Sequence, residues 1–314
     1  MSGVTDLLPY SGLILAMLLS GLLAGLVAGM FGIGGGFVVV PALAAVLSIF
    51  TAGTGADDRI MHVAIGTSLA TIIVTSIRSV HAHARRGAVD FDILKTWAPY
   101  IIGGVVIGIL LAKFMDGRTL KLIFGFGVLL MGLHFIFPFL ARRGALADSM
   151  PTGPLRTGLG SFIGGFCALL GIGGGTPAVL LMTLSGIPIH RAVATAAGFG
   201  TLIAIPGAIG AILVGWGEEG LPPFSLGYVN LIGLVAITTM SVITAPIGVA
   251  LAHNLDAARL KRVFGIYLVL TSTVMLYFAM PKLVPAVSGD EPLQAGKPAT
   301  LVTASDTMER KTER

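Results

Sequence analysis

The sequence has 314 residues, of which 55% are hydrophobic and only 11% are charged, and its formal net charge is +5. Between Asp6 and Asp57 lie 50 residues without one Asp, Glu, Lys or Arg, and Arg156 and Arg191 enclose another 34. Because a helix needs about 20 apolar residues to cross a bilayer, the composition indicates a polytopic protein of the lipid bilayer. It excludes a soluble enzyme, a nucleic-acid-binding domain and a disulfide scaffold.

Ten hydrophobic segments follow one another along the chain and predict an all-α membrane protein. They are residues 11–31, 37–51, 60–79, 95–114, 120–140, 157–172, 177–188, 192–215, 226–252 and 259–280. The polar stretches are predicted to be an N-terminal tail at 1–10, an inner linker at 141–156 and a disordered C-terminal tail at 281–314. The segments therefore fall into two groups of five, at residues 11–140 and 157–280.

The two groups of five segments are predicted to be copies of one another. The run FGIGGG recurs as LGIGGG, HVAIGT recurs as HRAVAT, and a third pair of runs shares five of ten positions. The matching runs are residues 31–36 with 170–175, 62–67 with 190–195, and 116–125 with 256–265. An odd number of segments makes the second copy enter the membrane from the opposite side. Such inverted repeats are typical of secondary transporters, whose sites lie near the midplane between the copies.

The basic residues predict which ends of the segments lie inside. With the N-terminus outside, ten Lys and Arg residues fall in inner loops and five in outer loops. The inner ones are Arg78, Arg85, Arg86, Arg142, Arg143, Arg156, Arg191, Arg259, Lys261 and Arg262, and the outer ones are Arg59, Lys113, Arg118, Lys121 and Lys282. Because short cytoplasmic loops carry the excess of basic residues, both termini are predicted to lie outside.

The two glycine motifs predict breaks in helices. Three consecutive glycines would each destabilise a helix interior by about 1 kcal/mol relative to alanine, so a mid-membrane turn is expected at each motif. New helices would begin near Phe37 and near Thr176 or Pro177, where Pro177 suits a first helical position. Whether the segments around each turn span the membrane or re-enter is left open.

A helix N-terminus binds anions through unsatisfied N–H groups and about half a positive charge. Two such ends from the two copies would form a site for a small anionic substrate. The predicted binding residues are Gly34, Gly35, Gly36, Phe37, Gly173, Gly174, Gly175 and Thr176. The alternative, a dinucleotide-binding loop, fails because Phe37 and Thr176 replace the last glycine of G-x-G-x-x-G and no strand precedes either motif.

Several polar residues near the motifs are further candidates. Thr67 and Thr195 occupy matching positions and are predicted, with Ser68, to donate hydrogen bonds from their hydroxyls to the substrate; the alternative is hydrogen bonding to their own helix. His62 and His190 also match and could carry a coupled proton, or have a structural role. Arg191 could attract anions at the inner mouth. The basic run from Arg78 to Arg86 is explained by membrane topology.

The absent residue types exclude other functions. No Asp or Glu lies within a predicted segment, which disfavours a cation exchanger because intramembrane acids mark cation paths. The segments also lack a Ser/His/Asp set, paired carboxylates and metal-ligand spacing, so neither an enzyme, a metal site nor a cofactor is predicted.

The glycine motifs and the runs after them resemble the TauE/SafE sulfite exporter family of membrane transporters. The resemblance rests on GLLAGLVAGMFGIGGG at 21–36, HVAIGTS at 62–68, GGFCALLGIGGGTPAVLL at 164–181 and HRAVATAAGFG at 190–200. It covers about residues 11–280. It implies a carrier in the bacterial inner membrane for sulfite, organosulfonates or related small anions, often in export.

Together these observations predict a secondary transporter of small anions that works by alternating access. An anion channel with the same site and a carrier for a non-sulfur carboxylate are the alternatives. The sequence leaves the substrate, the direction of transport, the coupling ion and the oligomeric state open.

Overall fold

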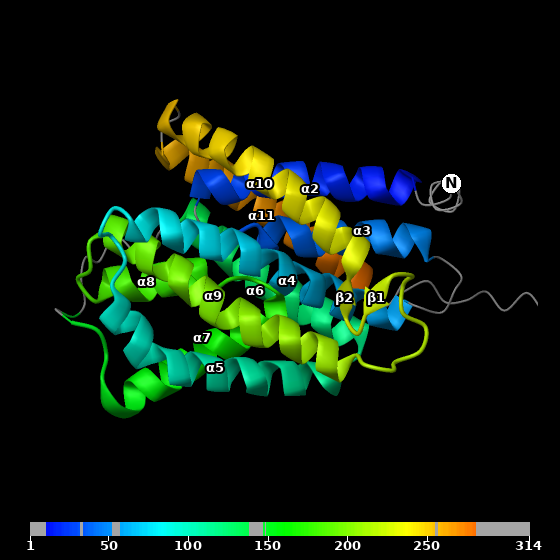
Figure 1. Ribbon diagram of the computed structural model, residues 1–314, viewed down its shortest axis with the longest axis horizontal. Helices are drawn as coiled ribbons and strands as arrows, with labels where there is room; N and C mark the ends of the chain where they lie inside the picture. The colour runs from blue at the N-terminus through cyan, green and yellow to red at the C-terminus, as the bar shows by residue number, and fades with distance from the viewer. Residues whose placement is uncertain are drawn as a thin grey trace, which may run out of the picture. The chain divides into compact units, whose positions relative to one another are not determined.

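The computed structural model describes residues 11–31, 34–51, 57–137, 147, 149–254 and 257–280. This part of the chain folds almost entirely into helices (Figure 1). They are α2 (Ser11–Phe31), α3 (Gly36–Phe50), α4 (Asp57–Ala84), α5 (Phe91–Lys113), α6 (Gly117–Ile136), α7 (Gly153–Leu170), α8 (Gly175–Leu184), α9 (Ile189–Val214), α10 (Leu231–Asn254) and α11 (Ala257–Ala279). Each predicted segment corresponds to one of these helices. The predicted tails and residues 141–146 and 148 of the predicted linker lie outside the described residues.

Several helices begin earlier or end later than the apolar runs predicted. α4 covers residues 57–84 instead of 60–79, and α5 begins at Phe91 instead of residue 95. At the start of α5 the Asp90 side chain accepts a hydrogen bond from the N–H of Ile93 at 3.1 Å. Such caps stabilise a helical turn built from polar residues, so hydropathy alone placed the ends of these helices wrongly.

The ninth segment is predicted to begin at residue 226, five residues before its helix does. Residues Ser225–Leu226 (β1) and Val229–Asn230 (β2) form a short antiparallel hairpin. Gly227 makes its turn with a φ of 53°, which favours glycine. α10 therefore begins at Leu231. The side chain of Asn230 caps this helix by accepting a hydrogen bond from the N–H of Gly233 at 2.8 Å.

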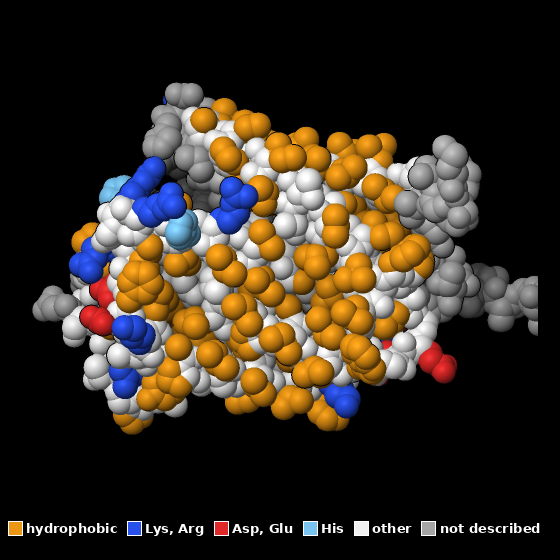
Figure 2. All heavy atoms as spheres, in the orientation of Figure 1, with side chains coloured by type: hydrophobic (Ala, Val, Ile, Leu, Met, Phe, Trp, Pro, Cys, Tyr) orange, Lys and Arg blue, Asp and Glu red, His pale blue; other side chains and the backbone are white. Residues whose placement is uncertain are grey.

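Seven of the described helices are long and apolar enough to cross a membrane, namely α2, α4, α5, α6, α9, α10 and α11. α3 and α8 are apolar but have only 15 and 10 residues. At about 1.5 Å per residue α8 spans only about half of a hydrocarbon core. In Figure 2 hydrophobic side chains cover the middle of the visible face, and most charged ones lie toward its two ends.

Close helix pairs form the core of the fold (Figure 1). α2 packs along α10, α5 along α7, α6 along α11 and α4 along α9. Glycines allow the closest approach: a Cβ atom at Gly25 would collide with Ser241 of α10, and one at Gly164 would collide with the backbone of Ile101 in α5. Stripes of small residues bring membrane helices together in this way.

Replacing Gly164 by valine is expected to lower the free energy of unfolding by about 1–3 kcal/mol, because the added side chain has no space against α5. A Cβ atom at Gly158, on the same helix, would meet nothing within 4 Å, so Gly158→Val is the control with the same change in helix propensity. Thermal unfolding in detergent measures both. Equal losses of stability would show that the close approach of α5 and α7 does not matter.

Candidate functional site

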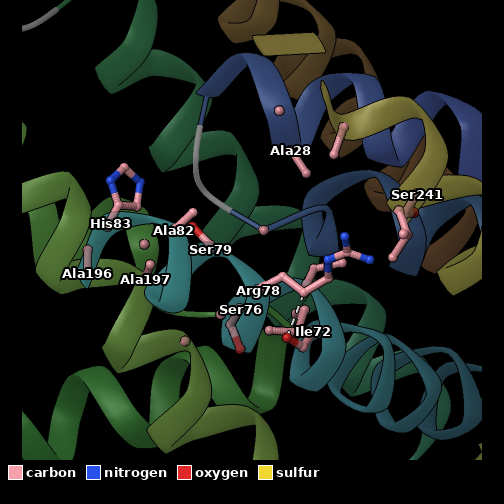
Figure 3. Close-up of a pocket in the computed structure, with 18 of the residues that line it drawn as sticks. Ala28, Ile72, Ser76, Arg78, Ser79, Ala82, His83, Ala196, Ala197 and Ser241 are labelled. Atoms are coloured by element: carbon pink, nitrogen blue, oxygen red, sulfur yellow. Dashed lines mark hydrogen bonds between the residues drawn. The ribbon is translucent and has the colours of Figure 1, made fainter. Parts of the chain in front are cut away.

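A cavity of about 360 Å³ lies between the two halves of the chain, within the size range of small-ligand pockets. Its walls come from the end of α2, the second half of α4, the first half of α9 and the middle of α10 (Figure 3). Both glycine motifs reach it, through Gly34 in the first copy and Gly173 and Gly175 in the second. The structure therefore brings the two motifs, 139 residues apart, to one cavity.

The first motif ends one helix and begins the next, between α2 and α3, as predicted. Gly34 has a φ of 65° and accepts a hydrogen bond from the N–H of Gly36 at 2.7 Å. The N–H groups of Val38 and Val39 both donate to the carbonyl of Gly35 at 2.9 Å and close the first turn of α3. Since a positive φ is strained for residues with a side chain, the turn requires glycine at position 34.

The second motif forms the turn that separates α7 from α8. Gly171 ends α7 with a φ of 64°, and Gly174 precedes α8 with a φ of 70°. α8 begins at Gly175, so Pro177 is its third residue and not its first, which corrects the prediction from the sequence. Proline fits there because the first N–H groups of a helix have no partner within it.

The two turns touch each other. A Cβ atom at Gly36 would lie 2.6 Å from the carbonyl oxygen of Gly171 and 3.0 Å from the Cα of Ile172. The hydroxyl of Ser68 donates to the same carbonyl at 2.8 Å. Ser68, predicted as a substrate ligand, thus ties α4 to the end of α7.

The remaining motif residues lie behind the cavity wall and are not among its lining residues. Phe37 is 1% exposed, and its ring packs edge-on against Phe264 with the ring centroids 6.3 Å apart. The Thr176 hydroxyl is buried and has no hydrogen-bond partner in the described part of the chain. Gly35, Gly36 and Gly174 are also absent from the lining.

Thr67 and Thr195 are both fully buried and are not among the residues that line the cavity. The Thr67 hydroxyl accepts a hydrogen bond from the N–H of Asn230 at 2.8 Å, and the Thr195 hydroxyl accepts one from the N–H of Asp90 at 2.9 Å. Asn230 and Asp90 precede α10 and α5. Each threonine therefore fixes the start of a helix from the other copy. Farther along α4, the hydroxyls of Thr71 and Thr75 donate to carbonyl oxygens of their own helix.

The predicted histidines and Arg191 also lie outside the cavity lining. Arg191 forms an ion pair with Asp90 at 3.0 Å, and His190 is exposed. His62 is buried near the start of α4, with Nε2 3.0 Å from the carbonyl oxygen of Ala112.

A compact polar cluster lies around His62. Its ring lies over the Tyr228 ring with the centroids 4.9 Å apart, and Arg59 contacts the Tyr228 hydroxyl at 3.4 Å and Glu218 at 2.9 Å. Burial raises the pKa of Tyr228, while the positive charge of Arg59 acts in the opposite direction. The adjoining cavity is only about 20 Å³, which leaves little room for a ligand at this end of α4.

The structure adds polar lining residues that were not predicted as a site. Along α4 and the turn after it, the lining includes Thr75, Ser76, Arg78, Ser79, His83 and Arg86. The basic members were attributed to membrane topology because the predicted segment ended at residue 79. A face continued at helical spacing from Thr75 through Ser79 to His83 and Arg86 was the signal available in the sequence.

Comparison with known proteins identifies the family. The sequence pattern of the family described as sulfite exporter TauE/SafE matches residues 17–275. A probable membrane transporter protein of Haemophilus influenzae is 34% identical over 267 residues, which cover 83% of this chain and 97% of that protein. No solved structure matches the chain.

Two further relatives have the same description. A probable membrane transporter protein of Methanocaldococcus jannaschii is 28% identical over 229 residues, covering 69% of this chain and 76% of that protein. A probable membrane transporter protein of Bacillus subtilis is 28% identical over 273 residues, which cover 79% of this chain and 92% of that protein. These matches confirm the resemblance and the prediction of a transporter rather than an enzyme. The chain belongs to the sulfite exporter TauE/SafE family of membrane transporters.

Proposed function

We propose that this transporter carries a small sulfur oxyanion, such as sulfite or an organosulfonate, and binds it in the cavity between the two glycine turns. The observation that carries the proposal is the meeting of Gly34, Gly173 and Gly175 at one cavity. α3 and α8 begin at these turns, and helix N-termini attract anions. The family description supports sulfite or a related anion as the substrate.

The lining of the cavity suits an anion better than a cation. It contains the hydroxyl groups of Thr75, Ser76 and Ser79 and basic side chains from the end of α4 and the turn after it, and none of the described residues that line it is acidic. Binding by backbone N–H groups and hydroxyls desolvates an oxyanion at low cost, because each oxygen keeps hydrogen-bond donors. Thr67 and Thr195 then act as positioning residues for α10 and α5, since their hydroxyls already accept hydrogen bonds.

Alternating access is supported by the contrast between the two halves. Ala28 and Gly29 line the cavity, whereas their counterparts in the second copy, Cys167 and Ala168, are fully buried. Ser241 of α10 lines the cavity too, whereas its counterpart Ile101 in α5 is not among the lining residues. If the two copies exchanged conformations, this cavity would close and an equivalent one would open at the opposite end.

The pairing of helices fits such an exchange. α2 of the first copy packs along α10 of the second, and their counterparts α7 and α5 pack along each other. We further propose that the two copies are inverted in the inner membrane with both termini periplasmic. The end of α4 that carries Arg78 and Arg86 then faces the cytoplasm, and the described state is open to that side.

Proteoliposomes containing the purified protein test this function. Uptake of labelled sulfite, an organosulfonate, sulfate and a small carboxylate is compared for the wild type, Ala28→Phe and Ala45→Phe. Ala28 lines the cavity, whereas Ala45 is exposed on α3. A large side chain in the cavity costs binding about 1–3 kcal/mol, so Ala28→Phe is expected to reduce flux about tenfold or more, and Ala45→Phe is expected to leave it unchanged.

Three outcomes would contradict the proposal. Transport of the carboxylate alone would assign a different substrate class. Single-channel conductance in a planar bilayer would indicate a channel, because a carrier has no continuous aqueous path. Equal flux for folded Ala28→Phe and wild type would remove the cavity from the transport path.

A further inference from the structure

Three basic side chains line the cavity at the end of α4 away from His62, two on the helix and Arg86 in the turn that follows it. Arg78 is exposed into the cavity region, His83 is half-buried and Arg86 is exposed. Figure 3 shows His83 and Arg78 on different sides of the cavity, and in Figure 2 Lys and Arg side chains gather at one end of the visible face. Arg78 lies more than a full turn before the end of α4 at Ala84, so it belongs to the wall as well as to the mouth.

The positive charge of these arginines is not neutralised by an ion pair within the described residues. The two ion pairs found there join Arg59 to Glu218 and Arg191 to Asp90. Among the residues that the structure describes, none of those lining the cavity is acidic. A neighbouring arginine, Arg85, is also exposed but is not part of the lining.

The counterparts of these residues in the second copy are uncharged. With His62 aligned to His190, Arg78 corresponds to Pro206, His83 to Ala211 and Arg86 to Val214. Those three residues lie in the last part of α9, toward the opposite end of the transport path. An exchange of the two halves would therefore open a mouth without these basic side chains.

We propose that Arg78, together with His83 and Arg86, forms an anion-capture site at one mouth of the transporter only. This inference rests on the proposed function, and it states that the substrate is bound more tightly in the state open at the α4 end. Arg78 determines this affinity, because a guanidinium group presents paired N–H donors that match two oxygens of an oxyanion. Arg86 raises the local anion concentration at the mouth, and His83 adds a ring N–H as a hydrogen-bond donor.

Flux measured from each side of the membrane tests the capture site. Inside-out and right-side-out membrane vesicles are prepared that contain the wild type, Arg78→Gln or Arg85→Gln, and the KM of transport is measured for labelled sulfite. Arg78→Gln is expected to raise KM about three- to tenfold from the α4 side and to leave KM from the other side unchanged. Arg85→Gln is expected to change neither value, although it removes the same charge from the same helix end.

The charge of the anion provides a second readout. A Coulomb contribution scales with the charge of the ligand. Arg78→Gln is therefore expected to raise the KM of a doubly charged anion by about the square of the factor measured for a singly charged anion of similar size. The difference between variant and wild type is expected to shrink at about 1 M salt, where charges are screened within about 3 Å. Arg78→Lys is expected to restore part of the affinity, since it keeps the charge but not the paired donors.

The outcomes separate this inference from the proposed function. If the wild type carries none of the anions, the proposed function fails. If the wild type transports but Arg78→Gln matches Arg85→Gln, or if KM rises equally from both sides, only the one-sided capture site is overturned. Equal thermal stability of the two variants in detergent shows that a change in KM does not come from misfolding.

Discussion

Alanine at position 36 is expected to reduce transport at least about 100-fold, whereas alanine at position 35 is expected to leave most of it. The Cβ of an alanine at position 36 would lie 2.6 Å from the carbonyl oxygen of Gly171. The two nearest atoms, the carbonyl oxygen of Gly171 and the Cα of Ile172, belong to the backbone. No flexible side chain can therefore move aside, and the two glycine turns must separate. Alanine otherwise favours the helix by about 1 kcal/mol over glycine, so a loss of function would come from this contact.

Gly35 is the matched control for Gly36. It has a helical φ of −58°, and a Cβ atom there would meet the Cβ and carbonyl oxygen of Ala24 at 3.1 Å. A shift of a few tenths of an ångström relieves that contact. Flux into proteoliposomes and thermal stability are measured for both variants. Similar flux for the two variants would mean that contact between the turns is not needed for transport.

The glycine motifs could be interpreted from the sequence because their effect is local. Three consecutive glycines destabilise a helix, so the breaks after α2 and α7 were predicted, and the structure confirms them. The match between the copies placed Gly34 and Gly173 in equivalent positions, and both line the same cavity.

Other features depend on contacts between residues far apart in the chain. Thr67 and Thr195 appeared to be a symmetric pair of ligands, yet each accepts a hydrogen bond from the start of a helix in the other copy. No local pattern distinguishes such an acceptor from a substrate ligand. Arg78 had a sufficient explanation in membrane topology, so only the packing of α4 against both turns identified it as part of the cavity wall.

The differences between the copies are also explained by tertiary contacts. Arg191 has no basic counterpart, because Val63 occupies the matching position. Its partner Asp90 likewise corresponds to the neutral Asn230. Both Asp90 and Asn230 accept a hydrogen bond from the first turn of the following helix and donate to a threonine of the other copy. The cap is thus retained in both copies, while the ion pair occurs in only one of them.

Cys167 provides a direct test of alternating access, because it is the only cysteine of the chain. It is 0% exposed, while its counterpart Ala28 lines the open cavity. In the state with the opposite half open, Cys167 would take the place that Ala28 has now. A membrane-impermeant thiol reagent is therefore expected to label Cys167 only from the side opposite to Arg78, and at least about tenfold faster when substrate drives exchange between the two states.

A cysteine moved to position 28 is expected to show the opposite labelling pattern. In Cys167→Ala combined with Ala28→Cys, the new thiol lines the cavity that is open in the described state, so the reagent is expected to label it from the α4 side without substrate. Substrate turnover is expected to slow that labelling, because it reduces the population of this state. If Cys167 stays unlabelled from both sides during measurable transport, the second half does not open as the first does. Transport would then require a different motion, since an exchange of equivalent halves must expose both positions in turn.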